Sequence, residues 1–220
     1  EKSKLIPCDF RLYDKPIGGK TKNEHFQEML RTAKERGFRP ACVTFDGWYS
    51  GLENLKLIHS FGWIFLTRLK SNRKVNPDNT KNIHISEVDI SVEHGSIVHL
   101  RGFGFIKVFK TLSSNNVDFD YWATNDLETT HHLFDRRAKR AFSIEIYHRA
   151  IKQTTGIEKT SVRSRQSWFA HASSSLRAFL RLELHRIRTG ISWYEAKLSI
   201  IRDAVRRYVN QPFFVLDSTA

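Results

Sequence analysis

Residues that cross-link or anchor a chain are scarce in this sequence of 220 residues. Cysteine occurs only at Cys8 and Cys42, which is too few for a disulfide framework. Both stand among strand-forming residues, so we expect two buried thiols in a reducing compartment. No run of about eighteen apolar residues occurs, and the start, EKSKLIP, has no signal-peptide core. The sequence therefore supports neither a membrane span nor secretion, and it predicts a cytoplasmic protein.

Acidic residues are also in short supply. There are 23 Asp and Glu against 36 Lys and Arg, which gives a net charge of +13 and a pI near 9.9. This balance favours a polyanionic partner such as nucleic acid over an acidic small molecule, although a ribosomal or membrane-surface protein would carry a similar charge. The excess is concentrated between Phe134 and Gly190, where thirteen Lys and Arg face four Asp and Glu.

Helical and strand-like patterns alternate in the first part of the chain. With 40% hydrophobic residues, the chain can bury one elaborated domain. The patterns predict strands over 4–13, 41–46 and 63–71, and helices over 20–37 and 50–62. This alternation is typical of an α/β fold.

A change of pattern follows. The stretches HISEVDIS, SIVHLRGFGFIKVFKTL and NVDFDYWAT alternate polar and apolar residues within and just after residues 71–120. Polar and glycine-containing turns separate them, so we predict antiparallel hairpins. From about Glu128 the chain is predicted to be helical and strongly basic.

Asp46 ends the predicted strand 41–46, directly before a glycine. The carboxyl ends of strands in open α/β sheets are where sites form. An aspartate after a strand is also an ordinary turn former, so position alone leaves both readings open.

A second carboxylate stands on the predicted helix FSIEIYHRAIKQ. Glu145, Arg149 and Lys152 are spaced i, i+4 and i+7, so they share one face of the helix. Ile144 and Ile151 are expected on the opposite side, with Tyr147 between them. The polar face fits a solvated, salt-bridged surface. On spacing alone that surface is the favoured reading, and the alternative is a site in which the carboxylate binds a divalent ion and the two cations hold DNA phosphates.

Three segments resemble the core of insertion-sequence DDE transposases: TFDGWYSGLENLKLI, WIFLTRLKSNRKV and FSIEIYHRAIKQTTGIEKTSVRS. The resemblance covers roughly residues 5–180. It implies an α/β fold, with an RNase H-like mixed sheet flanked by helices and a β-rich insertion between the second catalytic Asp and the Glu helix. Asp46 and Glu145 match those two catalytic, metal-binding positions, and Mg²⁺ or Mn²⁺ is the implied cofactor.

The family signature on the Glu helix runs Tyr, two residues, Arg, three residues, Glu, six residues, Lys. Glu145 and Lys152 reproduce its second half. Strict spacing places the earlier Tyr and Arg at Ala138 and Ala141, where this chain instead offers Arg137 and Arg140 nearby. The DNA contacts implied by the resemblance are Trp48 and Tyr49 as stacking aromatics, and Arg140, Arg149, Lys152, Arg163, Arg165, Arg177 and Arg181 as phosphate contacts.

The resemblance also divides the chain. Residues 1–70 correspond to the first part of the core, 71–120 to the insertion, 121–190 to the final strand, the Glu helix and basic helices, and 191–220 to a C-terminal helix and tail. The predicted strand with Asp9 corresponds to the third strand of the fold and not to the first. We therefore expect the first catalytic Asp to be missing, the chain to be incomplete at its N-terminus, and strand cleavage by this chain alone to be slight or absent.

The implied function is cut-and-paste DNA transposition in a bacterial, nucleoid-associated setting. The expected partners are double-stranded DNA with terminal inverted repeats, target DNA, and a second copy of the chain in a synaptic homodimer. Two alternatives remain open at this point. One is a catalytically inactive DNA-binding remnant of a transposase, and the other is an RNase H-like, structure-specific nuclease.

Overall fold

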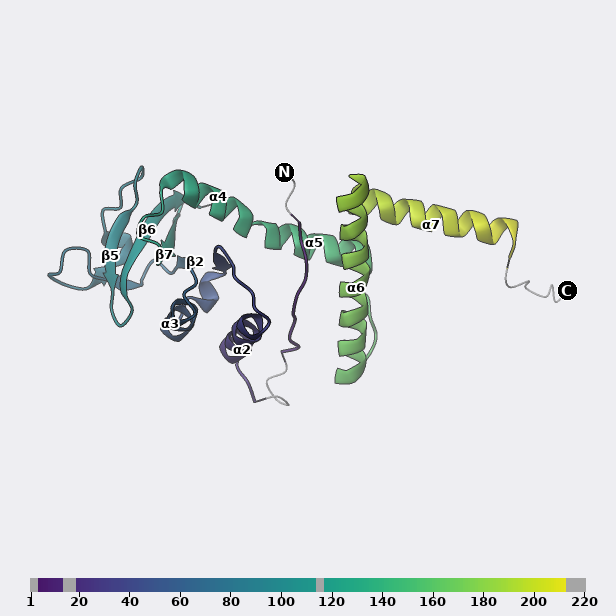
Figure 1. Ribbon diagram of the computed structural model, residues 1–220, viewed down its shortest axis with the longest axis horizontal. Helices are drawn as coiled ribbons and strands as arrows, with labels where there is room; N and C mark the ends of the chain where they lie inside the picture. Colours follow the sequence, from purple (N-terminus) through teal and green to yellow (C-terminus); the bar gives the residue numbers. More distant parts are fainter. Residues whose placement is uncertain (1–3, 14–18, 114–116, 213–220) are drawn as a thin grey trace. The chain divides into compact units, whose positions relative to one another are not determined.

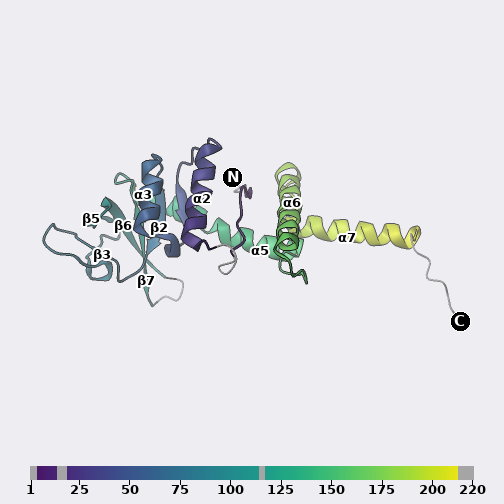
Figure 2. The same ribbon diagram turned by 90° about the horizontal axis from the view of Figure 1, so that it is seen from below.

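The computed structural model describes residues 4–13, 19–113 and 117–212. The chain forms two compact units. We call Asp9–Phe142 the sheet unit, and Glu1–Cys8 together with Ser143–Ala220 the helical unit. Both units are drawn in Figures 1 and 2.

A five-stranded mixed sheet forms the centre of the sheet unit. Its strands run in the order β1 (Val43–Phe45), β2 (Phe65–Leu69), β7 (Phe119–Thr124), β6 (Gly104–Leu112) and β5 (Ser96–Leu100). β1 and β2 are parallel, and the other neighbouring pairs are antiparallel. The hairpins predicted over 96–112 and up to Thr124 are confirmed, and their strands continue the sheet that contains β1 and β2.

Helices cover both faces of this sheet. In Figure 1, α2 (Lys22–Glu35) and α3 (Leu52–Ser60) lie on one side of it and α4 (His131–Ala141) on the other. The larger core, which includes Leu55, Ile58 and Phe65, fills the α2 and α3 side. Because side chains alternate along a strand, the next residue of β2, Leu66, packs on the other side against Phe134 of α4.

Local sequence signals set the bounds of α2. Thr21 accepts a hydrogen bond from the N–H of Glu24, and the Glu24 side chain accepts one from the N–H of Thr21, which forms a capping box. After the helix, Gly37 has a φ of +77°, a conformation that glycine adopts without strain. The predicted helix over 20–37 is confirmed.

A small second sheet departs from the prediction. β3 (Lys74–Val75) pairs with β4 (Ile83–His84), and the chain then forms a short 3₁₀ helix, η2 (Ile85–Glu87). The stretch HISEVDIS is therefore a strand only at its start. The 3₁₀ turn places Ile85 in the core, where it is fully buried, so the apolar alternation reflects burial and not an extended strand.

Three helices make up most of the helical unit. α5 (Ser143–Thr155), α6 (Arg165–Thr189) and α7 (Trp193–Asn210) pack around a core that includes Ile151 and Phe179. The predicted basic helical region is confirmed. None of the helices in the described part of the chain has the length and apolar character needed to cross a membrane.

Glu183 of α6 is fully buried and ties this unit together. Its carboxylate accepts hydrogen bonds from the N–H of Leu5 at 2.7 Å and from Nε1 of Trp193 at 2.8 Å. It also accepts from Nε of Arg186 at 2.6 Å and from Nη2 at 2.7 Å. Burial by itself would raise the pKa of Glu183, but the hydrogen bonds from Arg186, Leu5 and Trp193 outweigh it and lower the pKa. Glu183 and Arg186 thus form a buried ion pair, and the same carboxylate also bonds to the N-terminal segment at Leu5 and to the start of α7 at Trp193.

The predicted strand over 4–13 is wrong. The described residues of this segment form no strand. The backbone N–H of Leu5 donates instead to the side chain of Glu183, 178 residues away. Cys8 is consequently exposed, against the expectation of a buried thiol. Cys42 is partly buried beside Phe134, and burial raises the pKa of its thiol to about 11.

The prediction that Ile144 lies on the packed side of its helix is wrong. On α5, Ile151 is buried and Tyr147 is partly buried, as predicted, but Ile144 is exposed. The core cluster covers the helix from Tyr147 onward and does not extend to the first turn.

Candidate active site

Asp46 follows β1 directly and caps the short 3₁₀ helix η1 (Gly47–Tyr49). Its Oδ1 accepts a hydrogen bond from the N–H of Trp48 at 2.8 Å. Asp46 lies at a strand end as predicted, but β1 is the edge strand of the sheet and none of its residues is fully buried, so the expectation of a buried strand is wrong. The Asp46 carboxylate is well exposed, which places a hard oxygen ligand at the surface. The reading of Asp46 as a turn former is confirmed, because its side chain caps the turn, and its exposure leaves the carboxylate accessible.

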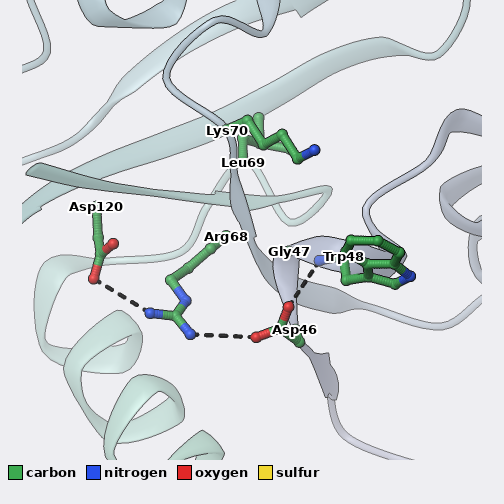
Figure 3. Close-up of a pocket in the computed structure, with 7 residues that line it drawn as sticks. All are labelled: Asp46, Gly47, Trp48, Arg68, Leu69, Lys70 and Asp120. Carbon is green, nitrogen blue, oxygen red and sulfur yellow. Dashed lines mark hydrogen bonds and ion pairs between the residues drawn. The ribbon is translucent and has the colours of Figure 1, made fainter.

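Arg68 links Asp46 to a second carboxylate. Its Nη2 lies 3.4 Å from Oδ2 of Asp46, and its Nη1 lies 3.5 Å from Oδ2 of Asp120 on β7 (Figure 3). The guanidinium centre also lies 5.6 Å from the ring centroid of Trp122, opposite Arg68 in the β2–β7 register. These three contacts place one cation between two carboxylates in an open depression that Gly47, Trp48, Leu69 and Lys70 also line.

Trp48 is the exposed aromatic of this depression. Its side chain is 63% exposed, and two ammonium groups approach the ring. Nζ of Lys22 lies 5.9 Å from the ring centroid and Nζ of Lys70 lies 6.0 Å from it. An accessible ring between two cations can stack on a base while the cations contact the phosphates.

Tyr49 has more contacts within the fold than Trp48. Its ring stacks on Phe26 of α2 with centroids 4.8 Å apart, and it is only partly exposed. Asn54 of α3 donates hydrogen bonds to the carbonyl of Tyr49 at 2.9 Å and to Oδ1 of Asn23 at 2.8 Å. The turn that carries Asp46 is therefore braced by both helices on that side of the sheet.

Gly47 is required by a close approach of two backbone segments. A Cβ at this position would lie 2.8 Å from the carbonyl oxygen of Arg68. This contact is too short for any side chain, so glycine allows the turn after β1 to rest against β2.

Arg137 and Arg140 stand near the two signature positions that this chain does not match, and they have different environments. Nη1 of Arg137 lies 2.9 Å from Oδ2 of Asp126 and 2.9 Å from Oγ1 of Thr129, and its side chain is largely buried. Burial by itself would raise the pKa of Asp126, but the hydrogen bonds from Thr129 and Arg137 outweigh it and lower the pKa. Arg140 is exposed at the end of α4. Arg137 thus fastens α4 to the end of β7, and Arg140 is the accessible one.

Glu145, Arg149 and Lys152 are all exposed on α5, while Ala150, Ile151 and Thr154 are buried. The predicted division of this helix into a charged face and a packed face is therefore confirmed around Lys152. Nζ of Lys152 lies 2.8 Å from Oε1 of Glu158, in an exposed ion pair of the kind that contributes little to stability.

The remaining basic candidates lie on or next to α6. Arg163 precedes the helix, and Arg165 is its first residue. Arg177 and Arg181 line a shallow depression on the same helix. All four are exposed.

The sequence reasoning missed Lys22, Arg68, Lys70 and Asp120. A signal was present for Arg68, which is the only charged residue within the apolar run of β2. Asp120 had no such signal, because its place beside Asp46 depends on the pairing of β2 with β7.

The model of the transposase DDE domain family matches residues 10–180. The chain belongs to this family. A search of curated proteins finds no significant match. The mixed sheet with helices on both faces is the RNase H-like fold expected of a DDE domain. DDE transposases are DNA-binding polynucleotidyl transferases that generally use divalent metals, and the matched region of the DDE domain contains both Asp46 and Glu145.

Proposed function

We propose that this chain acts in cut-and-paste DNA transposition by metal-dependent phosphoryl transfer. The observation that carries the proposal is the exposed carboxylate of Asp46 at the end of β1, beside an exposed tryptophan and three cations, within a DDE domain. This arrangement suits a DNA strand better than a small molecule, because it is open and combines phosphate-binding and base-stacking groups.

Asp46 and Glu145 are the proposed catalytic and metal-binding residues. Both offer exposed carboxylate oxygens, the ligand type that Mg²⁺ and Mn²⁺ prefer, and such ions are commonly held by one or two carboxylates completed by water and phosphate oxygens. The donor set therefore fits the cofactor of the family. When bound, the metal supplies charge stabilisation and activation of the attacking oxygen.

The chain's own residues position the DNA. Trp48 stacks on a base, and Tyr49, which is partly exposed, adds contact area. Arg140, Arg149 and Lys152 bind phosphates, and Arg163 and Arg165 add phosphate contacts at the start of α6. For Lys152, a phosphate has to replace Glu158 as the partner of the ammonium group.

Arg68 keeps Asp46 oriented in the absence of metal. One oxygen of the Asp46 carboxylate faces Arg68 and the other accepts the N–H of Trp48, so both oxygens have a partner. The same ion pair competes with a metal for Oδ2, so DNA binding without cleavage is the second candidate function.

The test begins with the DNA that flanks the reading frame, read outward for short terminal inverted repeats. A labelled duplex carrying one repeat is then incubated with the protein and Mg²⁺ or Mn²⁺. We expect specific binding of the repeat and slight cleavage by this chain alone, with cleavage lost in D46N and E145Q while binding is retained. Glu53→Gln, on an exposed glutamate of α3, is the matched control and should behave as wild type.

Each outcome separates the candidates. Binding that is unaffected by D46N and E145Q, with no cleavage under any metal, would identify a DNA-binding remnant. Cutting of branched or hybrid substrates without preference for the repeat would identify a structure-specific nuclease. Robust metal-dependent nicking of the repeat by the wild-type chain would refute the expectation that it is nearly inactive alone.

A further inference from the structure

Four side chains from three neighbouring strands form a row across the sheet at Asp46. β1 and β2 are parallel, and extending their register by one residue places Asp46 opposite Arg68. Arg68 is in turn opposite Trp122 of β7. Asp120 lies two residues before Trp122 and projects on the same face, because side chains alternate along a strand. The row therefore runs from a carboxylate to a guanidinium, and then to an aromatic ring with a second carboxylate beside it.

The side chain of Arg68 has partners on both sides of this row, and more of them on β7. Its guanidinium carbon lies 5.6 Å from the ring centroid of Trp122, and its Nη1 lies 3.5 Å from Oδ2 of Asp120. On the β1 side, its Nη2 lies 3.4 Å from Oδ2 of Asp46 (Figure 3). The side chain of Asp120 is 29% exposed against 61% for Asp46, so solvent screens the Asp120 ion pair less. A guanidinium that leaves Asp46 therefore keeps its partners on β7.

The two oxygens of Asp46 have different partners. Oδ1 accepts the N–H of Trp48 at 2.8 Å and forms the cap of the 3₁₀ turn, whereas Oδ2 faces Arg68. Oδ2 is thus the oxygen that the turn leaves available to a cation. A divalent ion at Oδ2 and the guanidinium would repel each other, because both are positive. Binding of an ion there requires Arg68 to withdraw from Asp46.

We propose that Asp120 is a positioning residue that retains Arg68 on β7 when a divalent ion occupies Oδ2 of Asp46. Arg68 then changes from a bridge between two carboxylates to a partner of Asp120 alone, over the ring of Trp122. This exchange favours ion binding, since the guanidinium always has an anion beside it. The inference rests on the proposed function, because it takes Asp46 as a metal ligand. It adds a role for Asp120 that is neither coordination of the ion nor contact with DNA.

Single and double substitutions separate this exchange from a plain effect of charge. In D120N, Arg68 loses its anion on β7 and pairs with Asp46 alone, so the Kd of a cation at Asp46 should rise about threefold or more. In R68Q, Oδ2 has no competing guanidinium, so the Kd should fall by a similar factor. In R68Q/D120N, there is no guanidinium for Asp120 to retain, and the Kd should differ from that of R68Q by less than about twofold.

The measurement is a titration of the full chain with Tb³⁺, a hard cation that prefers oxygen ligands and emits when a nearby tryptophan is excited. Trp48 donates its N–H to Asp46 and is the sensitising tryptophan. The titration is made without DNA at an ionic strength of about 0.5 M, where salt screens the direct charge of Asp120. D46N should remove the saturable emission, which assigns the signal to Asp46.

Lys107→Gln is the matched control for R68Q. It removes one positive charge from the same face of the sheet, where Nζ of Lys107 lies 5.7 Å from the ring centroid of Phe109. Its strand, β6, is three positions from β1 in the sheet, so the Kd should stay within about 1.5-fold of wild type. Urea unfolding midpoints of all variants should match wild type, because the ion pairs of Arg68 are exposed or partly exposed.

Two results would overturn the exchange alone. An equal effect of D120N in the wild-type and R68Q backgrounds would show a plain effect of charge. An unchanged or lower Kd in D120N would show that Asp120 does not draw Arg68 away from Asp46. Emission that is insensitive to D46N would instead refute Asp46 as a metal ligand, and with it both the proposed function and this inference.

Discussion

Replacing Glu183 by glutamine should destabilise the helical unit by about 3 kcal/mol. The variant keeps the shape of the side chain but removes the charge that the guanidinium of Arg186 and the indole N–H of Trp193 share. A glutamine also presents an NH₂ group toward donors, so at least one donor loses its acceptor. Separating a buried ion pair costs about 3 to 5 kcal/mol, and the lower end applies because Arg186, at 12% exposure, can turn partly to water.

The assay is urea unfolding followed by far-ultraviolet circular dichroism, which is sensitive to the helices α5, α6 and α7. Glu158→Gln serves as the control, since Glu158 is also paired with a cation, Lys152, but is exposed. Its effect should stay within about 0.5 kcal/mol. If the two substitutions lowered the free energy of unfolding equally, the large contribution of Glu183 could not be attributed to its burial and its several hydrogen-bond donors.

Three further predictions concern pH, the turn after β1, and DNA contact. The pKa values of Glu183 and Asp126 are lowered in the folded state. The two carboxylates therefore contribute fully to the free energy of unfolding at any pH above the ordinary carboxyl pKa values near 4. This contribution is lost as pH falls through the lowered values, and urea midpoints that stay constant down to pH 3 would contradict this. Gly47→Ala should cost about 1 to 3 kcal/mol because of the 2.8 Å contact with Arg68, whereas Gly51→Ala, which has no atom within 4 Å of its Cβ, should cost under about 1 kcal/mol in the same unfolding assay. Trp48→Ala should weaken binding of single-stranded DNA by about 1 to 3 kcal/mol in fluorescence anisotropy without changing the unfolding midpoint. Phe105→Ala, at a similarly exposed aromatic of the sheet unit, should bind as wild type, and equal losses in both would argue against a specific platform.

Elements with strong local signals were predictable from the sequence. The α2 helix has a capping box and a terminal glycine, and β1 and β2 are short apolar runs between polar turns. The position of Asp46 at a strand end followed from the same local pattern. The two faces of α5 followed from helical periodicity, apart from its first turn.

Features that depend on distant partners were not predictable. The segment with Leu5 has the composition of a strand, but its backbone bonds to Glu183, and nothing near Leu5 in the sequence indicates this. The ion pairs of Arg68 with Asp46 and Asp120 likewise depend on the register of β2 against β1 and β7. Periodicity reports which face of an element is buried, and it does not report which elements become neighbours.

The hydrogen bond between Leu5 and Glu183 has a consequence for synthesis on the ribosome. Its two residues are 178 positions apart, so at about 5 to 20 residues per second roughly 9 to 36 s pass between the translation of one and of the other. Residues 9–142, a continuous stretch, emerge in that interval and can fold as they appear. The segment around Leu5 has to wait in an open state until α6 is made. The nascent chain therefore completes its sheet before its helical unit, although Leu5 of the helical unit is translated before any residue of the sheet unit.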